Sequence, residues 1–258
     1  MQTTELLHRL AQKRIVGTLP EEVRNMAIDS RAVEEKTIFI CIKGYTVDGH
    51  DYAQQAVDSG ATVVVTEREL DLTGDVALVI VRSTDRTLGI LAAKFFDYPS
   101  QDITMIGVTG TNGKTTVSNM IEKMLLGLGI KSALKGTIGF DINGTLYQSS
   151  NTTSDALTTQ QMIFRPKSEH CRAMIMEVSS HGLILGRVAG IDFDVAIFTN
   201  LTQDHLDFHG TMENYGNAKG MLFSQLGQDS TKDKHVVLKS DDARSEKYET
   251  LTQFPIWR

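Results

Sequence analysis

A glycine-rich segment followed by lysine and threonine is the most chemically informative part of the sequence. It lies between an apolar run, 103–106, and a segment with apolar residues at helical spacing, 117–128, and it reads Gly107-Val108-Thr109-Gly110-Thr111-Asn112-Gly113-Lys114-Thr115-Thr116. Backbone N–H groups in such a strand–loop–helix turn surround phosphate oxygens at the positive end of the helix dipole. Lys114 would then reach the β- and γ-phosphates, and the Thr115 hydroxyl would ligate Mg²⁺.

The glycine spacing departs from the usual phosphate-binding pattern, which has four residues between its first glycine and the Gly-Lys pair. Five residues separate Gly107 from Gly113, and two separate Gly110 from it. A glycine-rich turn without ligand is the alternative. Because Gly-Lys-Thr-Thr stands between a strand and a helix, the segment nevertheless predicts an ATP site.

Titratable side chains follow two later strand-like runs. Glu177 ends the run 173–178, where a carboxylate suits Mg²⁺ binding or water orientation, although a surface glutamate is the ordinary alternative. His205 and His209 have a spacing that zinc pairs use on a helix. No cysteine lies near them and helical periodicity is unclear, so a role for His205 at a Mg²⁺–phosphate site is favoured. Lys219, taken alone, is a solvated charge on a helix.

The first hundred residues have the pattern of a small α/β unit. Apolar, β-branched strands are predicted at 37–42, 62–65 and 77–81, with a helix at 51–59. A second helix, capped by Asp85, is predicted to run to about Phe96. Tyr98-Pro99-Ser100 interrupts it, so we predict two domains, 1–98 and 99–258.

The second unit alternates short apolar strands with helices, which predicts a mostly parallel, doubly wound sheet and an α/β fold class. Further strands are expected at 195–200 and 235–238, a hairpin turning at Asn143-Gly144, and a helix at 212–226. A helix starting at Ser154-Asp155 is expected to end before Pro166. Ligands of such sheets bind beyond the carboxyl ends of the strands, where the motifs above fall.

Composition narrows the class of protein. The chain has 258 residues, 41% hydrophobic and 22% charged, with a formal charge of −6 and no basic patch, which argues against a nucleic-acid or membrane-surface binder. Cys41 and Cys171 show neither metal nor disulfide spacing, so both are expected to be buried and reduced. The N-terminal residues lack the apolar core of a signal peptide, and no run reaches membrane-spanning length. We expect a cytoplasmic monomer.

Four segments in order resemble the Mur ligases, the ATP-dependent amide-forming enzymes of peptidoglycan assembly, and within them the enzymes that add the third amino acid. These segments are Thr109 to Thr116, Glu177 to Leu183, Asn200 to Gly210 and Tyr215 to Phe223. Asp29 to Val33, Lys43-Gly44 and Asp48-Gly49-His50 are similar to the uridine-nucleotide-binding domain of those enzymes. The resemblance extends from about Ile28 to about Asp242.

The resemblance implies a catalytic set of Lys114, Glu177, His205 and Lys219. It implies ATP binding by Gly110, Thr111, Asn112, Gly113, Lys114, Thr115 and Thr116. One Mg²⁺ would be held by Thr115 and Glu177, and a second by His205 and Lys219. Lys219 would be carbamylated by CO₂, because a carbamate offers anionic oxygen whereas an ammonium repels the metal. The residues matching substrate-contacting positions are Ser30, Asn151, Thr152, Thr153, Ser179 and Arg187.

The implied reaction joins a diamino acid, lysine or diaminopimelate, to UDP-MurNAc-L-Ala-D-Glu through an acyl phosphate. Ser154 stands where the family usually has proline, and Pro166 interrupts what should be a continuous helix, so we predict a shortened helix there. The three family domains need roughly 400–500 residues, so we expect the central domain to be incomplete and the C-terminal amino-acid-binding domain absent. An inactive ligase fragment is therefore the leading hypothesis. A non-catalytic binder of UDP-MurNAc-dipeptide or ATP is the alternative, and a small P-loop kinase is disfavoured.

Overall fold

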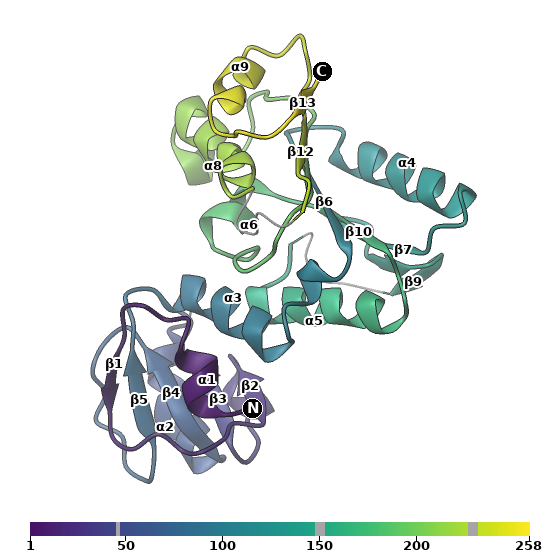
Figure 1. Ribbon diagram of the computed structural model, residues 1–258. Coiled ribbons are helices and arrows are strands. Elements are labelled where there is room, and N and C mark those ends of the chain that lie inside the picture. The colour runs from purple at the N-terminus through teal and green to yellow at the C-terminus, as the bar shows by residue number, and fades with distance from the viewer. Residues whose placement is uncertain (45–46, 148–152, 227–231) are drawn as a thin grey trace. The chain divides into compact units, whose positions relative to one another are not determined.

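The computed structural model describes residues 1–44, 47–147, 153–226 and 232–258 (Figure 1). These residues divide into two units, Met1–Asp97 and Tyr98–Arg258. Each unit has its own sheet, and each is described separately below. In the part of the chain that the structure describes, no helix is long and apolar enough to cross a membrane.

The first unit has a five-stranded sheet in the order β1-β5-β4-β3-β2, in which only β1 runs antiparallel. Its strands are β1 (Arg14–Val16), β2 (Asn25–Ala27), β3 (Thr37–Ile40), β4 (Ala61–Thr66) and β5 (Ala77–Ile80). Its helices are α1 (Thr3–Leu7), α2 (Ala53–Asp58) and α3 (Thr84–Phe95), with the 3₁₀ turns η1 (Ser30–Ala32) and η2 (Gly49–Tyr52). Every residue of β3 is buried, as expected for a strand of a parallel sheet covered on both faces.

The second unit has an eight-stranded sheet in the order β13-β12-β11-β6-β10-β7-β8-β9. All neighbours are parallel except those of the hairpin strands β8 and β9, so the predicted doubly wound α/β architecture is confirmed. Its strands are β6 (Thr104–Thr109), β7 (Ser132–Lys135), β8 (Phe140–Ile142), β9 (Thr145–Tyr147), β10 (Ala173–Glu177), β11 (Val195–Phe198), β12 (His235–Val237) and β13 (Ile256–Trp257). Its helices are α4 (Lys114–Gly127), α5 (Ala156–Ser168), α6 (Ser180–Ile184), α7 (Leu206–His209), α8 (Met212–Ser224) and α9 (Arg244–Glu249), with the 3₁₀ turn η3 (Pro99–Gln101).

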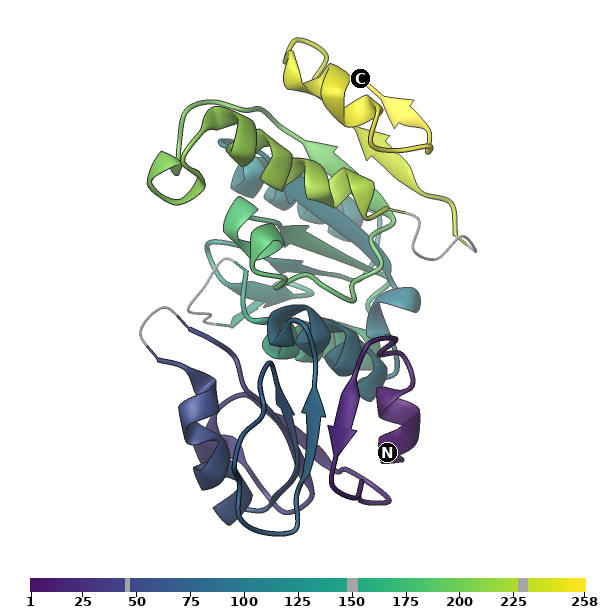
Figure 2. The same cartoon turned by 90° about the vertical axis from the view of Figure 1, so that its left-hand side faces the viewer.

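Helices cover both faces of this second sheet. Val117, Ile121 and Leu125 of α4 pack on one face, against the cluster that contains Val108 and Ile175. The opposite face carries the larger core, to which α5, α8 and α9 contribute. Figure 1 shows α4 and α8 on opposite sides of the strands, and Figure 2 views the sheet from the α8 side.

Strand β6 lies at the centre of this sheet, between β10 and β11. Val108 pairs with Glu177 on one side, and Thr109 pairs with Phe198 on the other. The residues that follow β6, β10 and β11 therefore emerge at one edge of the sheet, the carboxyl edge of its parallel strands.

The predicted hairpin is confirmed. Asn143 and Gly144 join β8 to β9 with φ angles of 53° and 88°, which is the mirror-image turn geometry that matches strand twist. The predicted burial of both cysteines is also confirmed. Burial raises the pKa of the Cys41 thiol to about 12, so this group stays protonated at neutral pH.

Two helix predictions are wrong. Helix α5 does not end before Pro166 but continues to Ser168, with Pro166 buried inside it. Proline costs the helix one N–H bond, here the bond to the carbonyl of Met162, and that loss is local because the helix ends two residues later. Helix α3 is capped not by Asp85 but by Ser83, whose hydroxyl accepts from the Arg86 N–H at 3.4 Å.

Candidate active site

The glycine loop connects β6 to α4 at the carboxyl edge of the second sheet. Gly107 is a strand residue, and its missing side chain makes room for the Phe193 ring. The loop proper begins at Gly110, where φ is +149° and a Cβ would overlap the Thr199 hydroxyl. The spacing that departs from the usual pattern thus has a simple cause: the first glycine serves packing, and the loop starts three residues later.

The residues that follow β11 form hydrogen bonds with the glycine loop. Asn200 accepts from two loop amides, from Thr111 N–H through its backbone carbonyl at 2.9 Å and from Asn112 N–H through its side chain at 3.0 Å. The Thr199 hydroxyl and the Asn200 amide donate to the Asn112 carbonyl at 2.6 and 3.0 Å. These four hydrogen bonds hold the loop in a defined shape, which a phosphate-binding loop requires.

Two lysines converge on the same loop. The Lys114 ammonium donates to the carbonyl oxygens of Gly110 at 2.9 Å and Thr111 at 3.0 Å. Lys219 reaches the Gly110 carbonyl from α8, at 2.8 Å, with its nitrogen 4.4 Å from the centre of the Tyr215 ring. Burial lowers the pKa of Lys114, and burial followed by the nearby Lys114 charge lowers the pKa of Lys219 to about 7. Lys219 is thus a largely neutral amine near physiological pH.

A carboxylate and a hydroxyl meet beside the loop. Glu177, at the end of β10, is 1% exposed, and its Oε2 accepts from the hydroxyls of Thr115 and Thr137 at 3.0 Å each. Its Oε1 accepts from the Thr137 N–H at 3.1 Å. A Cβ at Gly136 would overlap Oε1, so this glycine makes room for the carboxylate. Thr115 and Glu177 offer hard oxygen donors in one place, and such a donor set fits Mg²⁺.

His181, which follows β10, forms a cluster with His205 and His209, which follow β11. His205 adopts a left-handed backbone with φ of 50°, and its half-exposed ring lies 4.9 Å from the His181 ring and 6.1 Å from the Tyr215 ring. His209 is buried, with Nε2 at 2.9 Å from the Ser180 hydroxyl, and burial lowers its pKa. Within the described ranges, no group of three or more His, Cys, Asp or Glu side chains is arranged to hold a metal ion.

Three of the predicted substrate-contacting residues lie together next to Glu177. The Thr153 hydroxyl is 3.2 Å from that of Ser179 and 3.3 Å from the Glu177 carbonyl oxygen. Arg187 donates from Nη1 to the Thr153 carbonyl at 3.0 Å. Asn151 and Thr152 lie outside the described residues. Thr116 is exposed in the first turn of α4.

Ser30 belongs to the first unit, where it lines a pocket of about 660 Å³. Its hydroxyl donates to the Gln55 side chain at 3.1 Å. The pocket opens at the carboxyl ends of β2 and β3, and its lining includes Asp29, Ser30, Gly44, Val47, Gly49 and Gln55. The lining also includes the aromatic residues Phe39 and Tyr52 and the charged Arg31, so the pocket combines apolar surface with polar and charged groups.

Some contributors were missed by the sequence analysis. Thr137 makes two of the hydrogen bonds to Glu177, and Thr199 and Asn200 shape the loop. Tyr215 lies beside Lys219, with its hydroxyl 3.2 Å from that of Thr111. The only signal for them was position, since each lies shortly after a strand or within a motif already singled out.

Comparison with known proteins agrees with this geometry. Residues 108–255 match the Mur ligase middle domain, and residues 22–95 match the catalytic domain of the Mur ligase family. The UDP-N-acetylmuramoyl-L-alanyl-D-glutamate–L-lysine ligase of Staphylococcus haemolyticus is 49% identical over 257 residues, which are 100% of this chain and 52% of that protein. The enzyme of that name from Staphylococcus aureus strain RF122 is 46% identical with the same coverage. This chain thus spans about half the length of the curated relatives it matches.

Solved structures give the same result at the level of the fold. A UDP-N-acetylmuramoyl-L-alanyl-D-glutamate–2,6-diaminopimelate ligase superposes with a TM-score of 0.83 and 28% identity, over 99% of this chain and 51% of that one. A MurF ligase of Thermotoga maritima in complex with ADP shares the fold with a TM-score of 0.60 and 22% identity, over 91% and 50% of the two chains. The middle-domain match alone includes more than half of the 258 residues, and the chain belongs to the Mur ligase family.

Proposed function

We propose that this chain supplies the uridine-nucleotide-binding and ATP-binding units of a ligase that adds the third amino acid to UDP-MurNAc-L-Ala-D-Glu. The observation that carries the proposal is the Thr115–Glu177 pair, a hydroxyl and a buried carboxylate 3.0 Å apart beside a glycine loop with its lysine. The names of the relatives at 46–49% identity support L-lysine as that amino acid. Diaminopimelate, named for the structural relative at 28% identity, is the competing substrate.

The proposed reaction has two steps. The D-glutamate carboxylate of the substrate attacks the γ-phosphorus of ATP, which gives an acyl phosphate and releases ADP. The amine of the incoming amino acid then attacks the acyl carbon, and phosphate leaves as the amide forms with loss of a proton. Orientation and charge neutralisation account for most of the catalysis in such a transfer.

The residues of this chain have distinct parts in the proposal. The loop Gly110 to Thr116 binds the phosphates through those of its backbone N–H groups that do not donate to Asn200, and Lys114 leaves the loop carbonyls to neutralise the β- and γ-phosphates. Thr115 and Glu177 would hold one Mg²⁺, which when bound offsets the charge on the transferred phosphoryl group. The Thr137 hydrogen bonds orient the Glu177 carboxylate toward that position.

A second Mg²⁺ would be held by His205 and Lys219. The unmodified Lys219 side chain offers no oxygen ligand, so these two residues suit Mg²⁺ only if Lys219 is carbamylated. Carbon dioxide reacts with the neutral amine, forming a C–N bond and releasing one proton, and the pKa of about 7 makes that neutral form abundant. The resulting carbamate would bring two anionic oxygens to the side of the loop where the amine now contacts the Gly110 carbonyl.

The substrate would lie along two groups of residues. In the first unit, Ser30 and its pocket would bind the uridine nucleotide. In the second, Asn151, Thr152, Thr153, Ser179 and Arg187 would contact the dipeptide end, with the guanidinium of Arg187 pairing with a carboxylate or phosphate. The reaction would take place in the cytoplasm.

Because the chain spans about half the length of its relatives, we expect these 258 residues to bind nucleotides without completing the ligation. The test has two parts. Calorimetry with ATP and Mg²⁺ should show binding that is lost in Lys114→Ala and kept in Lys123→Ala, an exposed lysine on the same helix. Phosphate release is then measured with UDP-MurNAc-L-Ala-D-Glu, ATP, Mg²⁺ and either L-lysine or diaminopimelate.

The outcomes separate the parts of the proposal. Failure to bind ATP would refute the nucleotide site. Phosphate release above that of Lys114→Ala would refute the expected inactivity of the isolated chain. In a full-length protein, faster turnover with diaminopimelate than with lysine would refute the assignment of the third amino acid.

A further inference from the structure

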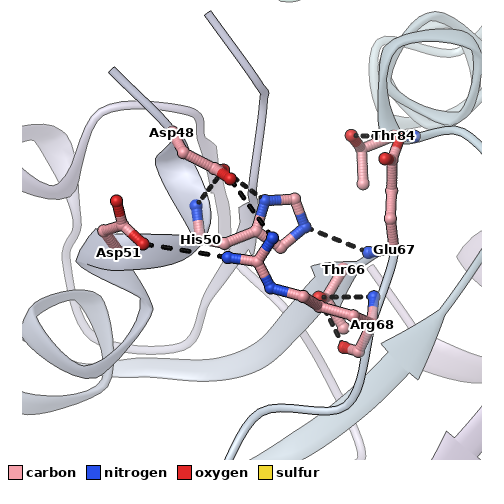
Figure 3. A network of polar contacts seen from close by, with 7 residues as sticks. All are labelled: Asp48, His50, Asp51, Thr66, Glu67, Arg68 and Thr84. Atoms are coloured by element: carbon pink, nitrogen blue, oxygen red, sulfur yellow. Dashed lines mark hydrogen bonds and ion pairs between the residues drawn. The ribbon is translucent and has the colours of Figure 1, made fainter.

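His50 is a buried histidine in the first unit, and the proposed function gives it no role. Its side chain is 1% exposed and lies between Asp48 and the residues that follow β4 (Figure 3). Both of its ring nitrogens have partners. Nδ1 lies 2.5 Å from Asp48 Oδ1, and Nε2 lies 3.1 Å from the backbone nitrogen of Glu67.

The two partners fix the proton on the ring. A backbone N–H can only donate, so Nε2 must be the acceptor of the Glu67 bond and carries no hydrogen. The single proton of the neutral imidazole therefore lies on Nδ1 and is donated to Asp48. In this tautomer every hydrogen-bonding group of the ring is used, and the ring bridges two segments 17 residues apart in the sequence.

On one side the bridge fixes the wall of the uridine pocket. Asp48 also accepts from the His50 N–H at 3.0 Å and from Arg68 Nη1 at 3.3 Å. The His50 N–H bond, followed by the His50 ring and the Arg68 charge, lowers the pKa of Asp48 to about 2. Gly49 N–H donates to the Ile42 carbonyl at 2.9 Å, so the backbone next to Asp48 returns to the end of β3. Gly44, Val47 and Gly49, which line the pocket, lie on this stretch.

On the other side the bridge is attached to a rigid part of the unit. Glu67 Oε1 accepts from the N–H and the hydroxyl of Thr84 at 2.9 and 3.2 Å, which ties the residue after β4 to the first turn of α3. The Thr66 hydroxyl donates to the Arg68 carbonyl at 2.8 Å and fixes the next turn (Figure 3). The Glu67 amide is therefore a fixed donor, because the chain on both sides of it is held.

We infer that His50 is a positioning residue of this pocket. Its Nδ1-protonated ring links Asp48 to the carboxyl end of β4 and thereby holds Gly44, Val47 and Gly49 in the shape that receives the uridine diphosphate part of the substrate. The identity of the ligand rests on the proposed function, whereas the link itself rests on the contacts above. A pocket wall that is ordered before binding loses less entropy when the ligand enters, so the link favours affinity.

The first test is titration with UDP, monitored by calorimetry and by the amide NMR signals of Gly44 and Gly49. His50→Ala removes both bonds, and we expect UDP to bind about tenfold more weakly or worse. His50→Gln keeps one donor and one acceptor on its amide and should bind within about threefold of the wild type. Arg68→Ala is the matched control, because it removes half-exposed ion pairs with Asp48 and Asp51 and leaves both bonds of the His50 ring in place.

Unchanged UDP affinity in a folded His50→Ala protein would overturn the inference, and so would an equal loss in His50→Gln and His50→Ala. The second test needs no ligand and no variant that must fold. Long-range ¹H–¹⁵N spectra of the wild type should show a proton on Nδ1 of His50 and none on Nε2, and an Nε2-protonated ring would refute the link. If the wild type fails to bind UDP, the pocket assignment in the proposed function is wrong, and this spectrum still decides whether the link exists.

Discussion

Lys114 and Lys219 donate to the same acceptor, the carbonyl oxygen of Gly110, at 2.9 and 2.8 Å. Two ammonium groups on one buried oxygen repel each other, and the carbonyl dipole offsets only part of that repulsion. The arrangement therefore favours loss of one proton, and Lys219, which is the more deeply buried, is the one whose pKa falls to about 7. The glycine loop thus contacts a cation, the ammonium of Lys114, and a reactive amine, that of Lys219.

Under the proposed function, removal of the Lys219 amine should abolish ligation in a protein of the relatives' length that contains these residues. Lys219→Ala leaves the loop without the group that would carry the carbamate, and a short carboxylate such as formate or acetate fits the space left behind. We expect phosphate release to fall to background and to recover in part when such a carboxylate is added. Acetamide, which has the shape of acetate but no charge, is the control and should restore nothing. Wild-type rates in Lys219→Ala without any addition would exclude the carbamate from the mechanism.

A methyl group at position 136 should displace the Glu177 carboxylate. The Cβ of Gly136→Ala would overlap Glu177 Oε1 and lie 2.8 Å from Glu177 Cδ, so the carboxylate would have to move away from its Thr137 hydrogen bonds. We expect Mg²⁺-dependent ATP binding to weaken by about tenfold or more, because a charge-assisted ligand would be misplaced. Gly127→Ala is the matched control: nothing lies within 4 Å of its added Cβ, and its ATP affinity should not change. Equal affinities in the two variants would show that Glu177 does not hold the metal.

Glu122 on α4 should make stability fall as pH rises. Burial, and next the neighbouring Asp141, raise the pKa of Glu122 to about 7, and its Oε1 has no hydrogen-bond partner. The unfolded chain releases this proton near pH 4.5, while the folded protein keeps it. The protonated Glu122 therefore makes its full contribution to the free energy of unfolding below pH 4.5, and that contribution is lost as pH rises through 7. Glu122→Gln keeps the neutral shape. Its free energy of unfolding in urea should match the wild type at pH 4 and exceed it by up to about 3 kcal/mol at pH 8.

The exposed Glu246 of α9 provides the comparison for this pH effect. Glu246→Gln should change the free energy of unfolding by less than about 0.5 kcal/mol at either pH, as surface substitutions usually do. A gain for Glu122→Gln that is the same at pH 4 and pH 8 would mean that packing, and not ionisation, causes it.

The sequence predicted the strands that are apolar along their whole length and the hairpin of β8 and β9, and it missed short strands such as β1 and β13. The runs that became β3, β4, β5, β10 and β11 are rich in β-branched or apolar residues because both of their faces are covered. By contrast β1 has three exposed residues and β13 has only two residues, so neither has a pattern to detect. Their pairing with β5 and β12 is a tertiary effect, which a local pattern cannot reveal.

The same division applies to the site. Gly110, Lys114, Thr115 and Glu177 were found because their chemistry requires those residue types at strand ends. Thr137 and Asn200 were missed because a threonine or asparagine in a loop has no distinctive pattern, although each makes at least two hydrogen bonds that shape the site. Pro166 led to the wrong prediction that its helix ends early. A proline near the end of a helix costs much less stability than one in the middle.

The pairing of β6 with both β10 and β11 determines how the second unit can unfold. Val108 and Glu177 are neighbours on one ladder, and Thr109 and Phe198 are neighbours on the other. Because the carboxylate and the loop are joined by ladder bonds of a buried parallel sheet, neither can drift from the other while the sheet exists. Amide hydrogens at these rungs should exchange only through global unfolding. Heat or denaturant will therefore not separate Glu177 from the glycine loop while the second unit is folded, and loss of the proposed nucleotide binding will coincide with the cooperative unfolding of that unit.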